Sequence, residues 1–463
     1  MRRLRRIDTA TRGCLLLAVL TLTLVGEEKA PAPPSFLIIA PHEFVASLRA
    51  FQQYKNAQMP TELVALESAL KTEGVDAPER LKRFLYEAWR ARGVRYALLV
   101  GDADVLPVRY MVLDRVTAPA FDYAFYPSDL YYADVARADG SFDDWNAERT
   151  DFHAGYFGEV RGEKNKSDPI NFDAIDYRAE VAVGRWPVAT TAEVARVAAK
   201  TMTFEKTRAA RAAPRRAAFV AVDGWVDMRV QLAGWAKSLE ASWSCERRFF
   251  ARPGETASTA PPTVDEILGL FNNGTELIIH AGHGGDDAWH ECLNVSHIPR
   301  LTNTAHPAIA ISAGCSTARL AALPPYEAYI DVNGVEHKGT NAGEVFTAPP
   351  PPPAPVQPTR LNGIGLGRQL LRQSDAGAVA YIGCNTGSQP CGLSLVEGLV
   401  RALAVAKPDA RLGDLWVAAI RYYYEHERLA TIAPTPDWYP ASVFFQGMKF
   451  MFFGDPTLRV GSQ

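Results

Sequence analysis

The chain has 463 residues, of which 48% are hydrophobic and 22% are charged, a balance typical of soluble globular proteins. Its formal net charge of −3 at pH 7 gives no bulk electrostatic reason to expect binding of nucleic acid or of an anionic membrane surface. The length allows one large domain or two to three ordinary ones, and composition leaves the function open.

The first 30 residues have the pattern of a signal peptide. A head rich in arginine is followed by an uncharged run from Cys14 to Val25. That run has the length of a signal-peptide core and is short for a bilayer span. We therefore predict export to the periplasm, the cell surface or the medium, with no membrane span after the leader is removed. An uncleaved membrane anchor is the alternative.

The cysteine count fits export. Removal of the leader takes away Cys14 and leaves five cysteines: Cys245, Cys292, Cys315, Cys384 and Cys391. Because five is odd, full pairing in an oxidising compartment still leaves a free thiol, which is a liability unless it does chemistry. The pairs Cys384–Cys391 and Cys245–Cys292 are compatible with the sequence, as are five buried, reduced cysteines.

The first half of the chain alternates strand and helix patterns. Residues 36–40, 96–100 and 180–185 are apolar runs typical of buried strands. In residues 61–72 and 78–90 apolar residues recur at intervals of three and four positions, a spacing that predicts helices. A further helix is predicted over residues 191–208. Residues 114–176 are rich in Tyr, Asp and Gly with little periodicity, which indicates loops over the surface.

The second half repeats this alternation. It contains four predicted strands, at residues 219–223, 276–280, 308–312 and 378–382. Four helices are predicted beside them, at residues 226–242, 264–272, 365–373 and 393–406. The pattern predicts an α/β fold with mainly parallel sheets flanked by helices. We expect two subdomains, 31–212 and 213–463, with the proline-rich residues 348–358 as a stiff, exposed loop insertion.

A histidine follows one of these strands directly. The run that ends at His280 leads into Ala281-Gly282-His283-Gly284-Gly285. Ligands gather at the carboxyl ends of parallel strands, so His283 is placed where a catalytic group belongs. The flanking glycines allow a sharp turn and a close approach of substrate.

A cysteine follows the next strand. Residues 308–312 lead into Ala313-Gly314-Cys315-Ser316, 32 residues after His283. An imidazole beside a thiol raises its thiolate fraction and later protonates the leaving amine. The pattern predicts a cysteine nucleophile, Cys315, with His283 as its general base. A buried core cysteine and a turn histidine are the structural alternatives.

These two elements resemble those of caspase-fold cysteine peptidases, and within that clan the chain resembles the gingipain family, peptidase family C25. The resemblance extends beyond His283 and Cys315 over roughly four-fifths of the chain. It is carried by residues 98–102 (LLVGD), 128–132 (SDLYY), 180–185 (EVAVGR), 282–285 (GHGG) with Trp289, and 453–458 (FGDPTL).

The resemblance implies a caspase-like C-terminal subdomain and a protein or peptide substrate, cleaved through an acyl-enzyme. It makes Gly284 and the Cys315 amide the oxyanion donors. Asp129 and Trp289 become substrate-binding residues, and Asp129 would grip Arg or Lys at P1. The alternative for Asp129 is a role in the loop or in holding calcium.

The same resemblance implies further features. An acid should orient His283, but residues 117–120 contain none, so Asp114 or Asp122 would substitute. The dyad needs no cofactor, while structural calcium is compatible with the Asp-rich loops.

Two other classes of function stay open. His280, His283 and His290 lie within eleven residues and suggest a zinc hydrolase, although no helical pair or paired acid supports them. A catalytically inactive caspase-fold scaffold or binding protein of the envelope is the second. An inactive protein would have no chemical need for His283 or Cys315. The presence of both residues therefore favours an enzyme.

Overall fold

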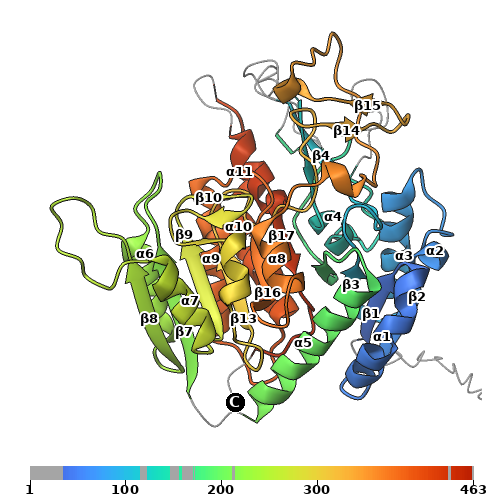
Figure 1. Cartoon of the computed structure of the whole chain (residues 1–463). Helices are drawn as coiled ribbons and strands as arrows, with labels where there is room; N and C mark the ends of the chain where they lie inside the picture. The colour runs from blue at the N-terminus through green and yellow to red at the C-terminus, as the bar shows by residue number, and fades with distance from the viewer. Residues whose placement is uncertain are drawn as a thin grey trace, which may run out of the picture. The chain divides into compact units, whose positions relative to one another are not determined.

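The computed structural model describes residues 35–114, 123–145, 156–158, 170–171, 173–210, 214–435 and 440–460. Its centre is a ten-stranded sheet (Figure 1). In spatial order the strands are β2 (Thr61–Ala65), β1 (Ser35–Ala40), β3 (Val94–Val100), β6 (Ala182–Trp186), β17 (Phe450–Phe453), β16 (Ala378–Cys384), β13 (Ala308–Ser312), β9 (Leu277–Ala281), β7 (Arg215–Ala221) and β8 (Trp243–Phe249). The predicted α/β class is confirmed.

The sheet has two halves that run in opposite directions. Strands β2, β1, β3, β6 and β17 are parallel to one another, and so are β16, β13, β9, β7 and β8. The halves meet where β17 pairs with β16 in antiparallel register. Their carboxyl ends therefore lie at opposite edges of the sheet, so loops that follow β3 do not join the loops that follow β9 and β13.

Helices cover both faces of the sheet, and each face has its own core. Successive strand residues point to opposite faces, so Leu37 and Ile39 enter one core while Phe36 and Ile38 enter the other. The first core includes α3 (Ala77–Arg92), α6 (Arg229–Leu239), α9 (Leu393–Ala404) and α10 (Leu412–His426). The second includes α1 (His42–Asn56), α5 (Thr191–Ala209), α7 (Val264–Asn272) and α8 (Leu366–Arg372).

Shorter elements complete the fold. Antiparallel pairs are formed by β4 (Tyr110–Asp114) with β5 (Tyr123–Pro127) and by β14 (Tyr329–Ile330) with β15 (Glu336–His337). A three-stranded sheet contains β10 (Gly284–Gly285), β11 (Ala288–Trp289) and β12 (Leu293–Asn294). The short helices are α2 (Leu66–Ala69), α4 (Leu130–Ala133) and α11 (Ala441–Gln446).

Three expectations need correction. Residues 61–65 form edge strand β2 instead of the start of a helix. In the region predicted as surface loops, Tyr131, Tyr132 and Trp145 are fully buried. The proline-rich stretch is packed and not freely exposed: the Val108 N–H donates to the Pro355 oxygen over 2.8 Å.

The predicted leader, residues 1–30, lies outside the described residues, and so does the subdomain boundary at 212/213; both stay predictions. No helix in the described part of the chain combines the length and the apolar character needed to cross a bilayer.

Candidate active site

Cys315 lies on a sharp turn directly after β13. The Ala313 N–H donates to the His280 oxygen over 3.0 Å, which continues the pairing with β9 past the end of the strand. Ser316 then has φ 57°, a left-handed conformation that few non-glycine residues adopt. Its N–H donates to the Thr386 oxygen over 2.8 Å, which fixes the turn. The backbone therefore holds Cys315 at the carboxyl edge of the sheet.

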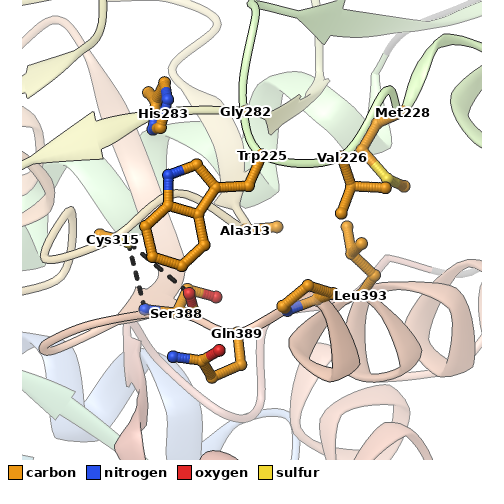
Figure 2. Close-up of a pocket in the computed structure, with 11 residues that line it drawn as sticks. Trp225, Val226, Met228, Gly282, His283, Ala313, Cys315, Ser388, Gln389 and Leu393 are labelled. Atoms are coloured by element: carbon orange, nitrogen blue, oxygen red, sulfur yellow. Dashed lines mark hydrogen bonds between the residues drawn. The ribbon is translucent and has the colours of Figure 1, made fainter.

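The thiol is partly exposed and contacts the loop after β16. The Ser388 N–H donates to the Cys315 Sγ over 3.3 Å, and the thiol lies 3.7 Å from the Ser388 oxygen (Figure 2). These two contacts fix the position of the sulfur beside this loop.

His283 lies in the glycine-rich loop after β9 and is exposed. Gly282 has φ 124°, and a side chain there would collide with the Val222 carbonyl. The His283 N–H donates to the Asp223 oxygen over 3.1 Å, so the loop after β7 supports the histidine from one side.

The histidine loop and the cysteine loop touch through glycine backbone. A Cβ atom on Gly314 would lie 3.1 Å from the Gly284 Cα, and one on Gly284 would lie 2.9 Å from the Cys315 oxygen. Only glycine allows so close an approach, which explains the glycines beside both candidate residues. The topology therefore brings together the two residues that the sequence predicts as a dyad.

His283 and Cys315 line one cleft of about 120 Å³ (Figure 2). The remaining lining residues are Trp225, Val226, Met228, Gly282, Ala313, Ser388, Gln389, Pro390 and Leu393. Trp225 and Ser388 were not predicted from the sequence to be part of the site. The position of Trp225 just after a predicted strand was the available signal, because loops at that edge of a sheet form binding sites.

His280 is a structural residue beneath the site. Its ring is fully buried and stacks on Trp289 with centroids 4.7 Å apart and planes at 3°. Its Nδ1 lies 2.9 Å from the Ser312 Oγ, which accepts the Gly314 N–H. Burial lowers the pKa of His280 from 6.5 to about 3, so the ring is neutral near pH 7.

This buried ring predicts acid sensitivity. Below pH 6.5 His280 binds a proton in the unfolded chain but stays neutral in the folded protein. The free energy of unfolding therefore falls as the pH drops from 6.5 toward 3. At pH 5 the loss from this residue is about 2 kcal/mol. Chemical denaturation at pH 7 and at pH 5 measures the drop in the free energy of unfolding between the two pH values. This drop should be smaller in His280→Asn than in the wild type by about 2 kcal/mol. Equal losses in both proteins would contradict the assignment.

The described residues contain no set of side chains that could bind zinc, so they do not support the metal-hydrolase alternative. The rings of His283 and His290 have centroids 6.0 Å apart and are nearly perpendicular, while His280 is enclosed by packing. Within the described ranges, no three His, Cys, Asp or Glu side chains are grouped to hold a metal ion. Structural calcium stays a prediction, because much of the Asp-rich segment 114–176 lies outside the described residues.

Neither of the two predicted substrate-binding residues is among those that line the cleft. Asp129 forms a two-pronged ion pair with fully buried Arg185, both N–O distances being 2.7 Å. Arg185 belongs to β6, whose carboxyl end is at the opposite edge of the sheet from Cys315. Trp289 is fully buried and donates from its Nε1 to the Tyr381 hydroxyl over 2.9 Å. Their contacts thus indicate structural roles and give no support for substrate binding.

The described cysteines are all free thiols, and neither proposed disulfide is formed. Burial raises the pKa of Cys245 to about 11, raises that of Cys292 and Cys384 to about 12, and also raises that of Cys391. These four thiols are therefore kept protonated near pH 7.

The acid expected to orient His283 stays a prediction. Asp122 lies outside the described residues, as does the side chain of Asp114.

The sequence matches peptidase family C25 over residues 29–461, and no curated protein matches it. The fold is similar to the crystal structure of the Arg-specific cysteine proteinase gingipain R, with a TM-score of 0.59 and 16% identity over 94% of this chain and 80% of that one. It is also similar to the complex of the Porphyromonas gingivalis RgpB pro- and mature domains, with a TM-score of 0.58 and 16% identity over 92% of this chain and 80% of that one. At these identities the likeness shows the fold.

Proposed function

Because the chain belongs to peptidase family C25 and is a cysteine peptidase, we propose that Cys315 and His283 form its catalytic dyad. One observation carries the proposal: the two side chains line the same cleft, on loops whose backbones touch at Gly284 and Gly314. The exposed imidazole and the partly exposed thiol can both reach a bound peptide.

In the proposed reaction, His283 accepts the Cys315 proton and the sulfur attacks the peptide carbonyl carbon. The amides of Gly284 and Cys315 donate to the resulting oxyanion. The C–N bond then breaks, the imidazolium gives its proton to the leaving amine, and a thioester remains on Cys315. His283 next takes a proton from water, whose oxygen attacks the thioester carbonyl carbon. The C–S bond then breaks, the imidazolium returns its proton to the sulfur, and the acid product leaves the free thiol behind.

We also propose that the protein acts outside the cytoplasm on protein or peptide substrates. The basic head and short apolar run of residues 1–30 support export. Gingipain R is an Arg-specific proteinase. Cleavage after Arg or Lys by this chain would need a carboxylate other than Asp129, because Asp129 is paired with Arg185.

A covalent probe tests the dyad. A peptidyl chloromethyl ketone should alkylate the wild type on Cys315, and labelling should vanish in Cys315→Ala. Labelling should survive in Cys391→Ala, a matched control because Cys391 neighbours Pro390 of the same cleft. Labelling is read by intact mass and peptide mapping.

Two results would overturn the proposal. A properly folded protein that no such probe labels would favour the inactive scaffold. Peptide hydrolysis that survives in Cys315→Ala and is abolished by a chelator would favour the metal hydrolase.

A further inference from the structure

The walls of the cleft beside Cys315 are apolar. Trp225 and Val226 form one wall on the loop after β7, and Leu393 forms another at the start of α9 (Figure 2). Pro390, in the short turn before α9, also lines the cleft. Trp225 is 80% exposed and Val226 38%, although such residues are usually buried. Large apolar side chains left open beside a nucleophile indicate a surface that a substrate covers.

Among the described residues, the lining of the cleft offers no carboxylate partner for a cationic side chain. None of its lining residues is Asp or Glu. The two carboxylates on the same loop already have arginine partners: Asp227 is 2.6 Å from Arg229, and Asp223 is 3.7 Å from Arg252. A lysine or arginine side chain inserted here would lose water without gaining an ion pair.

We infer that this cleft is the primary specificity pocket and takes an uncharged, apolar side chain such as Leu, Met or Phe, carried by the residue whose carbonyl Cys315 attacks. The inference rests on the proposed dyad, because the position of the sulfur decides which substrate residue enters the cleft. The Cβ atom of that side chain is two bonds from the attacked carbonyl carbon, so the side chain lies against walls that flank the sulfur.

The size of the cleft agrees with one side chain. Its volume of about 120 Å³ leaves room for several water molecules. An apolar side chain would release that water and cover Trp225 and Val226, whereas Gly or Ala at P1 would leave most of the cleft unfilled. We expect kcat/KM for Leu, Met or Phe at P1 to exceed that for Ala by about 10- to 100-fold.

The test is a fluorogenic peptide library with each amino acid fixed in turn at P1, applied to the full chain. The wild type should prefer Leu, Met or Phe over Arg and Lys by at least about tenfold. Val226→Asp places a carboxylate in the wall and should raise the Arg-to-Leu ratio of kcat/KM by about tenfold.

Val230→Asp is the matched control. Val230 is 80% exposed on α6 and does not line the cleft. It receives the same substitution, and the same change in net charge, four residues further along the chain. This variant should keep the wild-type ratio, so a shift confined to Val226→Asp assigns the effect to the cleft wall.

The outcomes separate the inference from the proposed function. Hydrolysis that requires Cys315 but prefers Arg or Lys would overturn the inference and leave the dyad intact. A ratio that shifts equally in Val226→Asp and Val230→Asp would overturn the assignment of this wall. The dyad itself would be overturned if no peptide of the library were cleaved and if Cys315 stayed unlabelled by covalent probes with either Leu or Arg at P1.

Discussion

Replacing His283 with alanine should lower kcat/KM by about 10²- to 10⁴-fold, because the variant loses both the base that activates Cys315 and the acid that protonates the leaving amine. The side chain is exposed and packs in no core, so the melting temperature should stay close to that of the wild type. Initial rates with a peptide that the wild type cleaves, together with thermal unfolding, measure both quantities.

His290→Ala is the control for this prediction. His290 is also exposed, and its ring centroid lies 6.0 Å from that of His283. The dyad has no use for a second imidazole, so this variant should retain activity within a few-fold. If His290→Ala lost as much activity as His283→Ala, or His283→Ala kept a tenth of the wild-type rate, the assigned base would be wrong.

The second large effect is expected from Gly284→Ala. A Cβ atom there would lie 2.6 Å from the Thr317 Cγ2 and 2.9 Å from the Cys315 oxygen, closer than atoms in contact tolerate. The histidine loop must move away from the cysteine loop, and a shift of about 1 Å in a catalytic group can cost roughly 100-fold in rate. We therefore expect kcat/KM to fall by about 100-fold.

Gly285→Ala serves as the matched control, since it adds the same methyl group one residue further along. A Cβ atom on Gly285 meets only the Asp287 Oδ1, at 4.0 Å, so the loop can stay in place. This variant should keep near-wild-type kcat/KM. Equal losses in Gly284→Ala and Gly285→Ala would show that contact between the loops is not what positions the dyad.

Buried parallel strands were predictable because they are continuous apolar runs. Residues 277–280 and 308–312 pair in β9 and β13, which are fully buried. A parallel pair puts its two carboxyl ends at one edge, so the order of the sequence was enough to bring His283 near Cys315.

Edge strands were not predictable in the same way. Strand β8 contains Glu246, Arg247 and Arg248, charges that an edge strand tolerates and that hide it in a search for apolar runs. In residues 61–72 the leucines at helical spacing cross the junction between β2 and α2, so the periodicity predicted one helix where two elements meet.

Substrate contacts depend on the direction of the sheet, which the sequence does not reveal. The resemblance suggested Asp129 for the specificity pocket. The antiparallel step from β17 to β16 puts Arg185, its partner, at the far edge. Trp289 is a buried neighbour of His280, whereas Trp225, which no motif marked, is the exposed indole in the cleft.

The most direct measurement is rapid-quench mass spectrometry during turnover of a peptide ester. An acyl group should appear on the tryptic fragment that contains Cys315, at a rate that accounts for product formation, and should decay as the substrate is consumed. Ester hydrolysis at full rate with no acyl group on Cys315, or with one on another residue, would contradict covalent catalysis by this thiol.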